Sequence, residues 1–146
     1  MNHWSLEYLG KPWTVDGMGP DAFNCWGLCV WIQKHHFNRE CPTYDLCNPR
    51  DTTLVAHKME TAASSPKWMR LKKATHGCIV AMGHSKHIHH VGIYLDVDGG
   101  MVLHSQSGKD EKLNRRGVQA QPFHSLVSHG WRRIEFYIHR TWLPQS

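Results

Sequence analysis

The chain has 146 residues, a formal charge of +5, 40% hydrophobic residues and seven tryptophans. This composition excludes a disordered chain, and the length predicts one compact domain over residues 1–146. No run of about 18 apolar residues is present, so no membrane span is expected. The positive charge lies in short runs without a recognised binding motif, so no nucleic-acid partner is expected.

Targeting and redox signals are sparse. The start, "MNHWSLEYLG", has neither the basic region nor the apolar run of a secretory signal, so we expect synthesis in the cytoplasm without export by that route. Five cysteines stand at positions 25, 29, 41, 47 and 78, without a CxxC pair. An odd number without a signal predicts free thiols and no disulfide framework.

Helical patterns occupy the first half of the chain. A Gly- and Pro-rich stretch over 10–22 predicts turns. A helix is expected from Cys25 to Phe37 because Asn24 is a good N-cap and apolar residues follow at i, i+3, i+4 and i+7. A second helix is expected over 51–63, ended by "SSP".

Strand patterns occupy the second half, over 78–82, 89–97, 101–106 and 132–140. The segment "DVDGG" at 96–100 suits a hairpin loop. Helices followed by antiparallel strands predict an α+β domain, with N-terminal helices packed on a central antiparallel sheet.

Cys25 draws attention because it opens the first expected helix. Unpaired amides and the positive end of the helix dipole favour an anion there, which predicts a lowered pKa and a reactive thiolate. Cys29, one turn deeper on the same face, is expected to be plain core. A small buried hydrophobe is the alternative for Cys25 alone, and a partner base would decide between the two.

Two histidines supply candidate partners. Strand alternation in "HHVGIYL" puts Val91 on one face and His90 with Gly92 on the other. If 96–100 closes a hairpin, His90 is expected roughly opposite His104, where one imidazole can hold the other. Gly92 is expected to leave room for the helix end. Cys25, His90 and His104 thus form a candidate nucleophile, base and orienting residue.

These motifs together resemble the NlpC-type cell-wall cysteine peptidases. "YLGKPWTVDG" is similar to the family's Tyr-x-Gly-x-Pro-aromatic segment, and "FNCWGLCVWI" to its Asp-Cys-(Ser/Trp)-Gly-Leu-Val motif. "HGCIVAM", "HHVGIYL" and "VLHS" resemble its three following strands. Asn24 and Cys78 stand where the family usually has aspartate. The resemblance covers about two thirds of the chain, and the tryptophan after Cys25 is most similar to the branch found in tail-assembly proteins of tailed phages.

The resemblance implies a papain-like α+β fold and hydrolysis of a peptide bond in the peptidoglycan stem by a Cys25–His90–His104 triad. It implies no cofactor and no metal. Tyr8, Trp13 and Trp26 are the implied substrate contacts, and peptidoglycan peptide is the implied partner. Other phage tail proteins are further implied partners, with incorporation in a tail or release to the cell wall.

Two alternatives stay open at this point. The stretch "HSKHIHH" holds His84, His87, His89 and His90, which makes a metal-binding protein conceivable, although no carboxylate or cysteine lies at the usual ligand spacings. A catalytically silent structural or binding protein of a phage tail tip would keep the fold without the chemistry. Retention of all three candidate catalytic residues argues against the second alternative.

Overall fold

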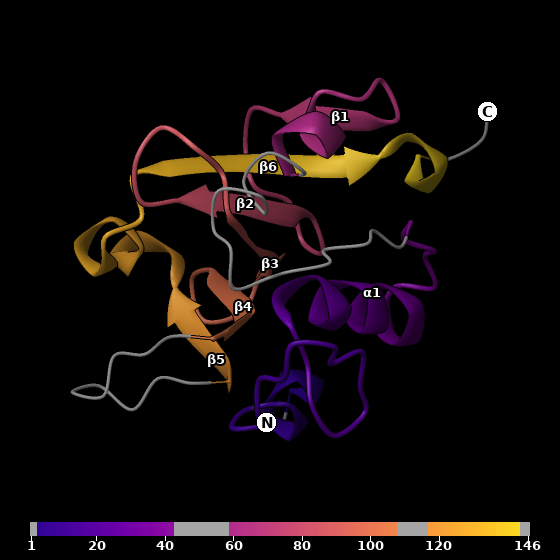
Figure 1. The fold of residues 1–146 in the computed structure, drawn as a ribbon, viewed down its shortest axis with the longest axis vertical. Coiled ribbons are helices and arrows are strands. Elements are labelled where there is room, and N and C mark those ends of the chain that lie inside the picture. The colour runs from indigo at the N-terminus through magenta and orange to yellow at the C-terminus, as the bar shows by residue number, and fades with distance from the viewer. Residues whose placement is uncertain (1–2, 43–58, 108–116, 144–146) are drawn as a thin grey trace.

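A computed structural model describes residues 3–42, 59–107 and 117–143, and its centre is a six-stranded antiparallel sheet (Figure 1). The strands are β1 (Trp68–Leu71), β2 (Ile79–Gly83), β3 (His90–Leu95), β4 (Met101–Gln106), β5 (Gly117–Pro122) and β6 (Arg133–His139). With the helix α1 (Cys25–His36) against this sheet, the expected α+β class is confirmed. No described helix is long and apolar enough to cross a membrane.

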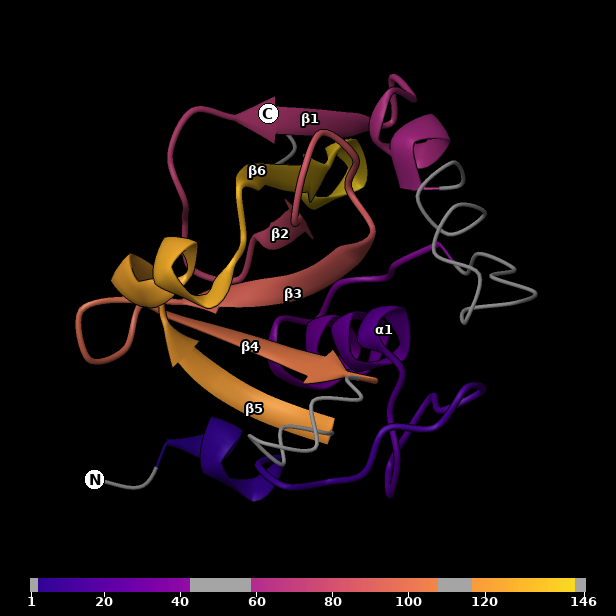
Figure 2. The same ribbon diagram turned by 60° about the vertical axis from the view of Figure 1, so that its left-hand side comes forward.

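The order of the strands across the sheet is β1-β6-β2-β3-β4-β5 (Figure 2). The four expected strands are confirmed within two residues at each end, and the hairpin at 96–100 joins β3 to β4. Two strands, β1 and β5, were not expected from the sequence. β5 is important for the candidate site because it pairs along its whole length with β4, which carries His104.

Helix α1 begins at Cys25, as expected, and ends at His36, one residue before the expected end. The side chain of Asn24 caps it, since Oδ1 of Asn24 accepts a hydrogen bond from the backbone amide of Gly27 at 2.6 Å. The segment before the helix is held against this start by two backbone bonds, Phe23 N–H to Pro12 O and Asn24 N–H to Gly17 O. The first turn of α1 is therefore fixed from both sides.

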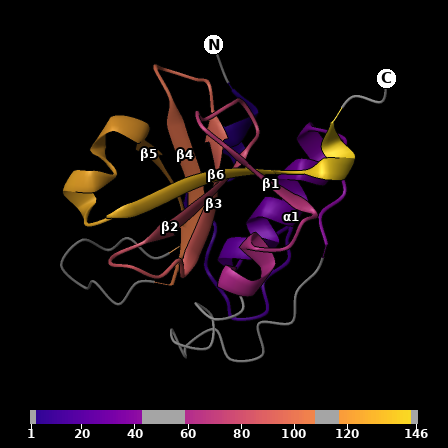
Figure 3. The same cartoon turned by 90° about the horizontal axis from the view of Figure 1, so that it is seen from above.

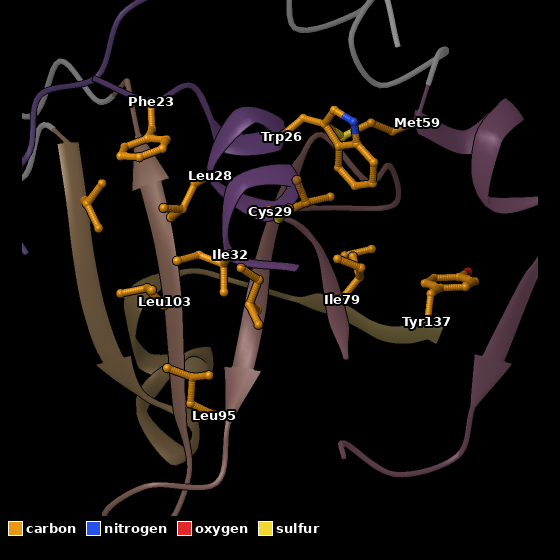
Figure 4. Close-up of a cluster of buried hydrophobic side chains, with 14 of the residues drawn as sticks. Phe23, Trp26, Leu28, Cys29, Ile32, Met59, Ile79, Leu95, Leu103 and Tyr137 are labelled. Atoms are coloured by element: carbon orange, nitrogen blue, oxygen red, sulfur yellow. The ribbon is translucent and has the colours of Figure 1, made fainter. Parts of the chain in front are cut away.

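One face of the sheet packs on α1 and holds the larger core (Figure 4). Leu28, Cys29 and Ile32 of α1 are fully buried, which confirms Cys29 as a core residue. They face apolar side chains of the central strands, which include Ile79, Val91, Ile93, Leu95 and Leu103. The helix is thus anchored by its inner face, and its N-terminus lies at the strand end where β3 begins.

The opposite face is covered by two short 3-10 turns, η2 (Phe123–Ser125) and η3 (Val127–His129), which lie across the sheet from α1 (Figure 3). Leu126 and Trp131 pack there on Val80, Met82 and Val102. This layer completes the burial of the polar residues that the sheet carries on that side.

The remaining elements tie the edges of the sheet. Residues 59–63 are helical, whereas the rest of the helix expected over 51–63 lies outside the described residues. Arg133 on β6 forms an ion pair with Glu60 from this helical segment and another with Glu135 on its own strand. Two further 3-10 turns, η1 (Trp4–Glu7) and η4 (Arg140–Trp142), stand near the ends of the chain.

Candidate active site

Cys25 is half-buried at the first residue of α1, and backbone amides surround its thiol. Burial raises the pKa of the Cys25 thiol to about 11, although hydrogen bonds with the backbone of Val91, Trp26 and Cys25 itself lower it in part. The expected lowering of this pKa is therefore wrong, because desolvation outweighs the helix N-terminus. The bond to Val91 places the thiol beside the first residues of β3.

His90 and His104 are brought together, as expected, by the hairpin. His90 Nε2 lies 2.8 Å from His104 Nδ1, and both side chains are buried. Burial lowers the pKa of His90 well below its usual range, and burial also lowers the pKa of His104 to about 4. Both imidazoles are therefore neutral at pH 7.

The register of the hairpin differs from the expected one by two residues. Ile93 pairs with Leu103, so His104 stands beside Gly92, and His90 reaches it diagonally. A Cβ at Gly92 would come within 2.9 Å of His104 Cβ and of Leu103 O. Gly92 thus makes room for His104, where the sequence suggested room for the helix end. Both histidines stay on the expected face because the shift is an even number of residues.

Gln121 continues the polar chain on the next strand. His104 Nε2 lies 2.8 Å from Gln121 Oε1, and Gln121 is buried. The three side chains form one row across β3, β4 and β5. Sequence reasoning missed Gln121, although the alternation Val118-Gln119-Ala120-Gln121 is the period-2 signal that could have revealed its strand.

Trp131 covers the histidine pair from the far face of the sheet. Its indole stacks on the His90 ring at 5.1 Å with an interplanar angle of 10°, and on the His84 ring at 4.1 Å and 12°. Trp131 is almost fully buried. The indole therefore fixes the plane of the His90 imidazole and keeps water from it. The sequence held no local signal for this contact.

The three expected substrate contacts lie in different environments. Tyr8 is buried, accepts a hydrogen bond from Trp31 Nε1 and bonds to His36, both in the second half of α1. Trp26 is also buried and donates to Pro42 O, whereas Trp13 is half-buried in the segment before the helix. Their substrate roles stay predictions, and the environments of Tyr8 and Trp26 give both a packing role.

An apolar cavity adjoins the start of α1. It is lined by Trp26, Met59, Ala62, Ala63, Trp68, Ile79, Ala81, Ile88, Val91 and Tyr137. Two of these residues border the thiol, because Trp26 follows Cys25 and Val91 bonds to it. The wall beside the candidate nucleophile is thus apolar on this side.

The histidine-rich stretch is divided between different roles. His84 and His89 lie with their ring centroids 4.8 Å apart beside Trp131, whereas His90 bonds to His104. Among the described residues, no group of three or more His, Cys, Asp or Glu side chains is placed to hold a metal ion. The described part of this stretch therefore gives the metal-binding alternative no ligand set.

A cysteine that opens a helix, packed on an antiparallel sheet that carries a bonded histidine pair, is the layout of the papain-like cysteine peptidases. The chain belongs to the NlpC/P60 family, a family of cysteine peptidases, whose model matches residues 10–132. The fold is similar to the crystal structure of the NlpC/p60 domain of the peptidoglycan hydrolase SagA, with a TM-score of 0.54, 16% sequence identity and 92% of each chain covered. No curated protein matches the chain.

Proposed function

We propose that this protein is a cysteine peptidase that hydrolyses a peptide bond in the stem of peptidoglycan. The observation that carries the proposal is the buried His90–His104 hydrogen bond at the start of β3, where the Cys25 thiol bonds to the Val91 backbone. Family membership supports the reaction class, and the substrate of the similar domain supports the polymer.

In the proposed reaction, Cys25 is the nucleophile and His90 is the general base. The thiol proton passes to His90 Nδ1 as the sulfur–carbon bond forms and the carbonyl electron pair moves onto oxygen. The backbone amides at the start of α1 are donors for that oxyanion. His90 then protonates the leaving amine, the carbon–nitrogen bond breaks, and a thioester remains. Water, deprotonated by His90, releases the acyl group and restores the thiol.

His104 holds and polarises His90 in this scheme. Its Nδ1 accepts the hydrogen bond from His90 Nε2, which stabilises the imidazolium that forms during attack. His104 therefore acts through His90, and its ring touches no reacting atom.

The test is incubation of the purified protein with peptidoglycan fragments, followed by mass spectrometry of the products. We expect new stem-peptide fragments with the wild-type protein and none with Cys25→Ala, while Cys29→Ala, altered in the core, keeps the cleavage pattern. Intact fragments with a folded wild-type protein would favour the silent scaffold instead. Treatment with a chelator is expected to leave hydrolysis intact, and loss that zinc restores would favour the metal-binding alternative.

A finer part of the proposal places the protein in a phage tail, which would carry it to the cell wall. It rests on the tryptophan at position 26, where the sequence is most similar to the tail-associated branch. The test is co-purification of the protein with phage particles produced by its host. Its absence from all tail fractions would remove this part and leave the peptidase proposal untouched.

A further inference from the structure

Gln121 is a buried polar residue without a role in the reaction just described. It lies on β5 opposite Val102, which puts its side chain on the same face as His104, one diagonal step away. Its amide oxygen stands 2.8 Å from His104 Nε2, at the end of the row that begins with His90. Buried polar groups are normally hydrogen-bonded, so this contact between the Gln121 amide and His104 must have a donor and an acceptor.

The donors and acceptors along the row can be assigned from its end. An amide oxygen only accepts, so His104 Nε2 must carry the proton that it donates to Gln121. In the neutral ring, His104 Nδ1 then has a lone pair and accepts from His90 Nε2. The neutral His90 consequently bears its proton on Nε2, and its Nδ1 is left with a lone pair.

We propose that Gln121 is a positioning residue that fixes the tautomers of His104 and His90 and thereby leaves His90 Nδ1 able to accept the thiol proton. The catalytic part of this inference, that His90 Nδ1 accepts the thiol proton, rests on the proposed function. The tautomer assignment itself rests on the two hydrogen bonds alone.

The opposite orientation of the amide would reverse the whole row. If Gln121 presented its NH₂ group, His104 Nε2 would accept, and its proton would move to Nδ1. His104 would then donate to His90 Nε2, and the proton of His90 would stand on Nδ1, where the base is needed. One amide oxygen on β5 therefore decides whether a residue two strands away is a base.

The neutral amide of Gln121 is also better suited than a carboxylate to accept the hydrogen bond from His104. Gln121 supplies an acceptor without a charge, so it orients the pair without drawing a proton onto it. The hydrogen bond from His104 to Gln121 raises the pKa of His104 only in part, because burial lowers it to about 4. The base thus stays unprotonated at neutral pH.

The first test reads the tautomers directly, by long-range ¹H–¹⁵N correlation spectra of protein with ¹⁵N-labelled histidine at pH 7. His90→Ala and His104→Ala assign the two rings by loss of their signals. We expect both rings to be protonated on Nε2, and Gln121→Met to give mixed tautomers for both. Gln119→Met, on the same strand, is the matched control and is expected to keep the wild-type pattern. A wild-type His104 protonated on Nδ1 would overturn the inference.

The second test separates positioning from packing by kinetics on peptidoglycan fragments. Gln121→Met is expected to lower kcat severalfold with KM unchanged, because molecules with the wrong tautomer lack the base but keep the substrate contacts. Gln121→Glu keeps an acceptor, so it should retain activity at high pH while the acidic limb of kcat/KM moves up by about one pH unit.

A purely structural role gives a different result. Gln121→Met would then lower the melting temperature without changing the tautomers of His90 and His104. Gln121→Glu would leave the acidic limb of the kcat/KM profile in place. Either result contradicts the proposal. If Gln121→Met does not fold, Gln121→Glu still decides through its pH profile and spectra. If wild-type protein cleaves no fragment, the proposed function fails, whereas the spectra still decide the tautomer assignment.

Discussion

In the folded protein Cys25 is a neutral thiol, and His90 and His104 are neutral imidazoles. A helix N-terminus contributes at most about 2 kcal/mol toward an anion, which here is less than the cost of desolvating a thiolate. Burial raises the pKa of Cys25 to about 11 and lowers that of His90 well below its usual range. In the proposed reaction, proton transfer would therefore accompany attack on the substrate, and no thiolate–imidazolium pair needs to exist beforehand.

This state predicts the pH dependence of alkylation at Cys25. Since the pKa is raised, the thiolate fraction at neutral pH is small and grows about tenfold per pH unit, so the rate with iodoacetamide should climb steadily from pH 6 to 9. Peptide mapping by mass spectrometry should place this label on Cys25 ahead of the fully buried Cys29. A rate that stays level from pH 5 to 8 would instead reveal a preformed ion pair.

The two histidines should differ in their tolerance of substitution. His90→Ala removes the proposed base, and we expect turnover to fall about 10²–10⁴-fold. His104→Gln keeps a group able to hydrogen-bond, so it should retain more activity than His104→Ala. Initial rates on peptidoglycan fragments measure the series. An inactive His89→Ala beside a harmless His104→Ala would mean that the wrong histidines have been assigned.

Sequence reasoning could place Cys25 at a helix start and bring His90 to His104 because each position carries a local signal: a helix start or a strand position beside a turn. It could not find Trp131, whose stacking on His90 depends on a turn-rich segment that folds over the far face. It predicted a lowered pKa for Cys25, whereas burial raises this pKa. Burial depends on how the folded chain packs, and the position of a residue in a helix does not reveal it.

At the scale of elements, the β3–β4 hairpin sets the geometry of the histidine pair. The sequence predicted the hairpin and its faces but not its register, because a loop with Asp98, Gly99 and Gly100 at positive φ allows several alignments of the strands. The observed register places Gly92 directly beside His104, where a side chain would collide with the His104 Cβ.

Gly92→Ala should therefore damage both stability and chemistry. The added Cβ would stand 2.9 Å from a backbone oxygen and from His104 Cβ, so the strands must shift, at a cost of about 1–3 kcal/mol. Gly99→Ala in the same hairpin is the control, because its Cβ meets nothing within 4 Å and only the positive φ is strained, which costs about 1 kcal/mol. Urea denaturation and fragment cleavage should show activity lost in the first variant and kept in the second. Equal activity in both would contradict the role given to Gly92.

Helix α1 depends on its cap in a similar way. Asn24→Ala removes the acceptor for Gly27 N–H and should lower the free energy of unfolding by about 1 kcal/mol. Asn24→Asp keeps an acceptor at the same position and should stay within about 0.5 kcal/mol of wild type. Urea denaturation compares the two variants, and an equal loss in both would show that Asn24 acts mainly through its amide donor to Val15 O, which both variants lack.

At the scale of the whole molecule, buried histidines make the fold sensitive to acid. Burial lowers the pKa values of His36, His89, His90, His104 and His139 below the ordinary value. An unfolded chain takes up these protons near pH 6.5, whereas the folded chain does so only at lower pH. Their contribution to stability is thus complete above pH 6.5 and is lost as the pH falls toward the folded pKa values.

We therefore expect the free energy of unfolding to fall as the pH is lowered from 6.5 to 4, by about 1.4 kcal/mol per pH unit for each proton involved. For His104, whose folded pKa is about 4, the window covers this whole range. In urea titrations at pH 7, 6 and 5, His104→Gln should reduce the dependence of the free energy of unfolding on pH by the contribution of about one proton. The same slope in both proteins would mean that His104 is not held neutral in the fold.

The place of β6 has a consequence for how the protein is made. This last strand lies between β1 and β2, so 133–139 pairs with 68–71 on one side and 79–83 on the other. Until the ribosome has released that strand, β1 has no neighbour and β2 has an open edge. A nascent chain that already contains Cys25, His90 and His104 therefore cannot close its sheet, and it exposes unpaired strand edges until β6 is added. The order of synthesis thus delays closure of the sheet between β1 and β2 until nearly the whole domain has left the exit tunnel.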